Sequence, residues 1–128
     1  MDGVFALAPQ DEEAKLRFEL AKLEKALCWV ETDQADQAIE LIQKVIGDAD
    51  PQQIELHARA YNALGYCHLK ADQPQDAVLA YLHVELIYNS IPDVHYEALS
   101  QLVVLWRTLG ELQRSRETEM LLKERYSR

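Results

Sequence analysis

The chain has 128 residues, of which 48% are apolar, and carries a formal net charge of −9 at pH 7 with a pI of about 4.8. The apolar content is enough for a core, so a disordered chain is excluded, and one domain is expected at this length. The excess of acidic groups disfavours binding to nucleic acid and to anionic membranes, because both carry negative charge.

Six helices are predicted, because proline, glycine and polar turns divide the chain and no segment alternates with the period of a strand. In chain order they cover about 11–31, 35–46, 51–70, 74–88, 92–109 and 111–126. Asp50-Pro51 is interpreted as an N-cap followed by a first-turn proline. Gln73-Pro74 and Ile91-Pro92 are interpreted as two further helix starts.

Residues 1–10 form a separate N-terminal segment that does not resemble a secretion signal. It has an acid at Asp2, no basic residue and only a short apolar run, 4–8. No apolar run in the chain approaches the roughly 18 residues that span a bilayer. We therefore expect a cytoplasmic location. Cys28 and Cys67 each fall in an apolar helical pattern and are predicted to be buried thiols in a reducing compartment.

A bulky ring followed nine residues later by a small residue recurs three times along the chain. The three pairs are Trp29/Ala38, His68/Ala77 and Trp106/Ser115, separated by 39 and then 38 residues. Each unit is a long helix, a tight turn and a shorter helix. Small residues let paired helices approach closely, and such a pair buries its apolar face only by stacking on another pair.

The middle unit resembles the tetratricopeptide repeat, whose pattern is Trp-x2-Leu-Gly-x2-Tyr followed by Ala-x3-Phe. It reads Tyr61-x2-Leu64-Gly65-x2-His68 and then Ala77-x3-Tyr81. The flanking units match less well, since Lys25-Ala26 replaces Leu-Gly in the first and Glu119 takes an aromatic position in the third. The resemblance covers repeats of about 12–46, 51–88 and 92–126.

This resemblance implies an all-α fold, a right-handed α-α superhelix (solenoid) of three helix-turn-helix repeats with six helices. The implied repeat-packing residues are Trp29, Ala38, Gly65, His68, Ala77, Tyr81, Trp106 and Ser115.

The resemblance also implies that the first helix of each repeat lines a concave face where a protein or peptide partner binds. The implied residues are Leu20, Leu23, Leu27 and Val30, then Arg59, Asn62, Tyr66 and Lys70, and finally Arg107. The four apolar residues are spaced 3, 4 and 3 and so form one stripe. Three interpretations stay open: the stripe docks a partner helix or extended peptide, forms a homodimer seam, or is plain core. The run 4–8 would also cover it by folding back.

No catalytic or metal site is predicted. The acid–histidine pairs Glu55/His57, His83/Glu85 and Asp93/His95 are two residues apart and point to different faces of a helix. His68 and Asp72 are four apart but too few to bind a metal, and no glycine-rich phosphate loop is present.

We therefore expect no cofactor and no enzyme activity. The expected function is a non-catalytic protein–protein interaction module or scaffold. The alternatives are a structural homo-oligomer, a fragment of a larger assembly protein and, least favoured, a regulatory domain of an enzyme.

Overall fold

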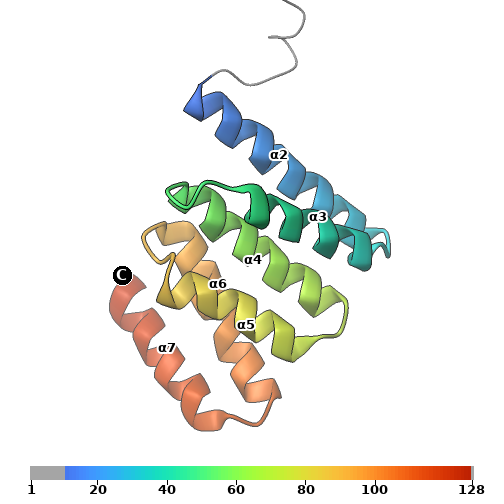
Figure 1. Cartoon of the computed structure of the whole chain (residues 1–128). Coiled ribbons are helices and arrows are strands. Elements are labelled where there is room, and N and C mark those ends of the chain that lie inside the picture. Colours follow the sequence, from blue (N-terminus) through green and yellow to red (C-terminus); the bar gives the residue numbers. More distant parts are fainter. Residues whose placement is uncertain (1–10, 128) are drawn as a thin grey trace, which may run out of the picture.

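The computed structural model describes residues 11–127, which form six α-helices without a strand among them (Figure 1). They are α2 (Glu12–Glu31), α3 (Ala35–Asp48), α4 (Ile54–Lys70), α5 (Pro74–Leu86), α6 (Pro92–Thr108) and α7 (Leu112–Tyr126). The all-helical prediction is thus confirmed for this part of the chain. The predicted N-terminal segment, 1–10, and its apolar run lie outside the described residues. Within 11–127, no helix is long and apolar enough to cross a membrane.

Two of the three predicted proline starts are confirmed, and one is wrong. Pro74 and Pro92 open α5 and α6. At Asp50-Pro51 the chain instead makes a turn, and α4 begins only at Ile54. The Asp50 carboxylate accepts a hydrogen bond from the Gln52 backbone N–H at 2.9 Å. Aspartate followed by proline also suits the first two positions of a β-turn, which explains the error.

The helices α2, α4 and α6 end in the same way. Each is followed by a residue with positive φ, and the next N–H donates to the carbonyl of the bulky ring residue five positions back. The positive-φ residues are Asp33, Asp72 and Gly110, and the bonds are Gln34 to Trp29 (3.0 Å), Gln73 to His68 (2.8 Å) and Glu111 to Trp106 (2.8 Å). This closure is the Schellman motif. It recurs with the spacings of 39 and 38 residues already found in the sequence.

Each helix packs on the next, and α2, α4 and α6 also pack on one another in that order. The helix α4 is central, since it contacts α2, α3, α5 and α6. Buried apolar residues form one cluster around α2, α3 and α4 and a second around α4, α5 and α6. Among the described helices, α7 packs on α6 alone, at the end of the molecule (Figure 1).

The helices α4 and α5 pack tightly at Gly65. A Cβ placed on this residue would lie 2.6 Å from Cε2 of the buried Tyr81 ring, so only glycine fits without a shift. The small residues Ala38 and Ala77 are fully buried at the start of α3 and α5.

The corresponding residue of α7, Ser115, is also buried. Its hydroxyl donates to the Val103 carbonyl at 2.8 Å, which links α7 to α6. The three ring residues of the sequence pattern, Trp29, His68 and Trp106, are half-buried at the helix ends.

Candidate binding groove

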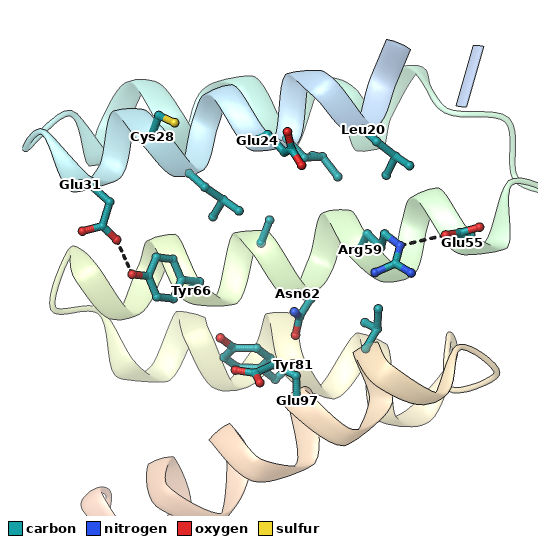
Figure 2. A pocket seen from close by; sticks show the side chains of 14 residues that line it. Leu20, Glu24, Cys28, Glu31, Glu55, Arg59, Asn62, Tyr66, Tyr81 and Glu97 are labelled. Atoms are coloured by element: carbon teal, nitrogen blue, oxygen red, sulfur yellow. Dashed lines mark hydrogen bonds and ion pairs between the residues drawn. The ribbon is translucent and has the colours of Figure 1, made fainter. Parts of the chain in front are cut away.

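An open groove of about 870 Å³ lies between α2 and α6, with α4 along its length (Figure 2). Six of the nine predicted partner-binding residues line it: Leu20, Leu23, Leu27, Arg59, Asn62 and Tyr66. The lining also includes Ala63 and Val94, Tyr81 of α5 on the floor, and four carboxylates. We call this feature the α2–α4–α6 groove.

The apolar stripe of α2 is divided between the core and the groove. Successive residues turn by about 100° around a helix, so Leu23 and Val30 share one direction, while Leu20 and Leu27 point about 60° away. Leu23 and Val30 are buried, at 4% and 5% exposure, whereas Leu20 and Leu27 stay half-buried. Val30 therefore belongs to the core and does not line the groove, while Leu23 contacts both.

Two predicted cations lie outside the groove lining. Lys70 is exposed at the end of α4, with its ammonium 5.4 Å from the centre of the Tyr66 ring. Arg107 is exposed in the last turn of α6. Long charged side chains near a helix end extend into solvent, where the carbonyl groups of the helix terminus also favour a positive charge.

Arg59 is the cation in the groove lining, and its guanidinium is already paired. Its Nε donates to Glu55 at 2.9 Å and its Nη1 donates to Asp93 at 3.2 Å, which joins α4 to the start of α6. Burial alone would lower the pKa of Arg59, but the two carboxylates outweigh it and raise that pKa.

A second polar link crosses from α4 to α2. The Tyr66 hydroxyl donates to the Glu31 carboxylate, as the dashed line in Figure 2 marks. This hydrogen bond is the main reason that the pKa of Tyr66 is raised, and burial adds to it. One carboxylate oxygen of Glu31 is used here, so lone pairs remain for other donors.

The groove floor contains two polar groups beside α6. Burial, and then the charge of Glu97, raise the pKa of Tyr81, so its hydroxyl stays protonated. Asn62 of α4 lines the same groove as Tyr81 and Glu97 (Figure 2). Its buried Oδ1 has no hydrogen-bond partner among the described residues.

The two thiols differ in their surroundings. Cys67 is fully buried, and burial raises its pKa to about 11. Cys28 is exposed on the α2 wall of the groove, so the prediction that it is buried is wrong. At about 100° per residue, Cys28 points roughly 150° away from the direction that Leu23 and Val30 share, so it lies off the core side of α2.

Sequence reasoning missed a polar contact between three helices. His95, fully buried in α6, contacts the Glu85 carboxylate of α5 through Nε2 and the Tyr126 hydroxyl of α7 through Nδ1 at 2.6 Å. These residues are 10 and 31 positions apart, so no local spacing signals the contact. Within 11–127, no group of three or more histidine, cysteine or acidic side chains is placed to hold a metal ion.

Comparison with known proteins gave no match to a family model, to a curated protein or to a solved structure.

Proposed function

We propose that the chain is a right-handed solenoid of three tetratricopeptide-like repeats that binds a segment of a partner protein in the α2–α4–α6 groove, without catalysis. Three features support this proposal: the recurrent helix closure, the contacts among α2, α4 and α6, and the groove itself.

The recurrence supports the repeat architecture. The positive-φ residues Asp33, Asp72 and Gly110 follow the ring residues by four positions and carry the same pattern of backbone bonds. In addition, α4 contacts both α2 and α6, as expected when helix-turn-helix units stack with their first helices side by side.

The single observation that carries the function is the composition of the groove. Leu20 and Leu27 line the groove together with Ala63 and Val94. Their side chains stay half-buried, whereas Leu23 and Val30 on the same helix are buried. A concave apolar surface with a few placed polar groups is typical of a binding site. Bound apolar side chains supply affinity at such a site, while polar neighbours such as Asn62 and Tyr66 set orientation.

The test uses a random-peptide display library selected against the whole chain. We expect the selected peptides to lose about tenfold or more in affinity, at least 1.4 kcal/mol, when Leu20→Asp and Leu27→Asp are combined. The control combines Leu112→Asp with Met120→Asp, which changes two exposed apolar residues of α7. This control is expected to stay within about twofold of the unchanged protein. The proposal would be contradicted if the control variant lost as much affinity for the selected peptides as the groove variant does. It would also be contradicted if the library yielded no binding peptide.

A second readout does not depend on the stability of a variant. Because Cys28 lines the groove and is exposed, a bound peptide is expected to slow its alkylation by iodoacetamide. An unchanged alkylation rate at a saturating concentration of peptide would place the peptide elsewhere.

An exposed apolar row on α5 favours a structural homo-oligomer as the second candidate function. Leu79 and Leu86 are 59% and 68% exposed and share a face of α5, since they are seven positions apart. Ile87, the residue directly after the helix, is 61% exposed. Under this alternative, light scattering gives a mass above that of one chain, and Leu79→Glu with Leu86→Glu reduces it to one chain. A monomer before substitution would rule the alternative out.

A further inference from the structure

The charges around the α2–α4–α6 groove are unbalanced. Four carboxylates line it, from Glu24, Glu31, Glu55 and Glu97, against the single guanidinium of Arg59. That guanidinium is already paired with Glu55 and Asp93. The groove therefore has an excess of negative charge that its own cation does not neutralise.

The remaining carboxylates lie on two opposite walls. Glu24 and Glu31 are on α2, seven residues and so about 10 Å apart along the helix, and Glu97 is on α6 (Figure 2). Leu20 and Leu27 are also on the α2 wall, and Ala63 of α4 and Val94 of α6 continue the apolar lining. A ligand that fits both features has an apolar strip with positive charges on its two sides.

The backbone of the ligand adds a further constraint. An extended peptide needs hydrogen-bond partners for its own N–H and C=O groups, and sheet-like recognition supplies them from an exposed strand edge. The described residues form no strand, and the groove lining offers one side-chain amide, Asn62. A helix satisfies its own backbone and presents side chains at i, i+3, i+4 and i+7.

From these observations we infer that the groove binds a basic amphipathic helix of a partner protein. Its apolar residues lie against Leu20, Leu27 and Val94, and its lysine or arginine residues pair with Glu24, Glu31 and Glu97. This inference rests on the proposed function and adds the charge and conformation of the partner segment. The overall charge of −9 would also speed the encounter with a positively charged segment.

The experiment uses three defined peptides of about 18 residues, or five helical turns. The first has leucine on one helical face and lysine on the others, the second has glutamate in place of each lysine, and the third is the lysine peptide with a central proline. Dissociation constants are measured by fluorescence anisotropy with the whole chain. We expect the lysine peptide to bind about tenfold or more tightly than either of the other two, with weaker binding as salt rises.

The location of the charge effect is tested by matched variants of the protein. Glu24→Gln with Glu97→Gln removes two carboxylates from the groove, while Glu40→Gln with Glu124→Gln removes two exposed carboxylates from α3 and α7. We expect the first pair to weaken the lysine peptide about tenfold and the second pair by less than about twofold, because charge pairing is lost only in the groove. Equal weakening by both pairs would show attraction to the overall charge and overturn the inference.

Other results separate this inference from the proposed function. Equal or tighter binding of the glutamate peptide, or no binding of the lysine peptide, overturns the basic-helix inference. The proposed function survives that result if library-selected peptides still protect Cys28 from alkylation and bind less tightly after the substitutions at Leu20 and Leu27. If the selected peptides show neither effect, the proposed function fails together with the basic-helix inference.

Discussion

At Gly65, a missing Cβ sets how closely α4 and α5 approach. Gly65→Ala is expected to destabilise the protein by about 1–3 kcal/mol, because the new methyl group would lie 2.6 Å from the Tyr81 ring. Urea denaturation measures the change.

Gly47→Ala is the matched control for this substitution. A Cβ at Gly47 would meet nothing within 4 Å, and the residue lies inside α3, so the change should stabilise by about 0.5–1 kcal/mol. If Gly65→Ala had no effect or a stabilising one, the described packing of α4 on α5 would be incorrect.

The two cysteines should react at very different rates. Cys28 is exposed, whereas Cys67 is fully buried with a pKa raised to about 11, so little thiolate forms there at pH 8. We expect a thiol-specific reagent to modify one thiol in the folded protein and the second only on unfolding. Mass spectrometry of the digested protein identifies the site. Rapid modification of Cys67 in the folded protein would contradict its burial.

At the scale of the element, the left-handed turns after α2, α4 and α6 have different residues in the same conformation. Gly110 has φ of +83° with no neighbour within 4 Å of an added Cβ, so Gly110→Ala tests backbone strain alone. It should cost about 1–2 kcal/mol. Asp72, at φ of 61°, should respond in the opposite sense, with Asp72→Gly neutral or stabilising. Thermal denaturation of both variants checks the pair, and the same sign for both would argue against a shared turn conformation.

The last helix packs on α6 alone among the described helices, and Ser115 is its one buried residue. Near its end, the Tyr126 hydroxyl forms a hydrogen bond with His95 at 2.6 Å. Tyr126→Phe removes that bond and should cost about 0.5–1.5 kcal/mol. Hydrogen exchange should show the loss of protection in the last turns of α7, with α4 protected as before. A loss spread evenly over α2 to α7 would instead indicate that α7 unfolds together with the rest.

The sequence was sufficient to predict the helices, but not every helix start or contact. Pro74 follows the turn at 71–73 and Pro92 follows the turn at 89–91, so the start of each helix was predictable. Asp50-Pro51 fits either a helix start or a turn. The structure shows a turn, because α4 begins only at Ile54 and the Asp50 carboxylate accepts a hydrogen bond from the Gln52 N–H. The contact of Glu85 with His95 depends on how α5 packs against α6, which no local pattern contains.

At the scale of the whole molecule, six of the nine predicted partner-binding residues line one groove because they share a face of α2 or α4. Val30 is buried and does not line the groove, since a rotation of about 60° separates the core edge of α2 from its groove edge. The gathering of four carboxylates around a single cation in the lining was not predicted. It requires the relative placement of α2, α4 and α6, which appears only in three dimensions.

The central claim is that the α2–α4–α6 groove is the binding surface of this molecule. The most direct measurement is NMR mapping of backbone amide shifts in the whole chain as the lysine peptide, or the tightest library-selected peptide, is added. We predict that the largest shifts occur in residues 20–31 of α2, 55–66 of α4 and 93–97 of α6. Shifts confined to the exposed row at Leu79, Leu86 and Ile87, with none in the groove, would contradict the claim and favour α5 as the interface.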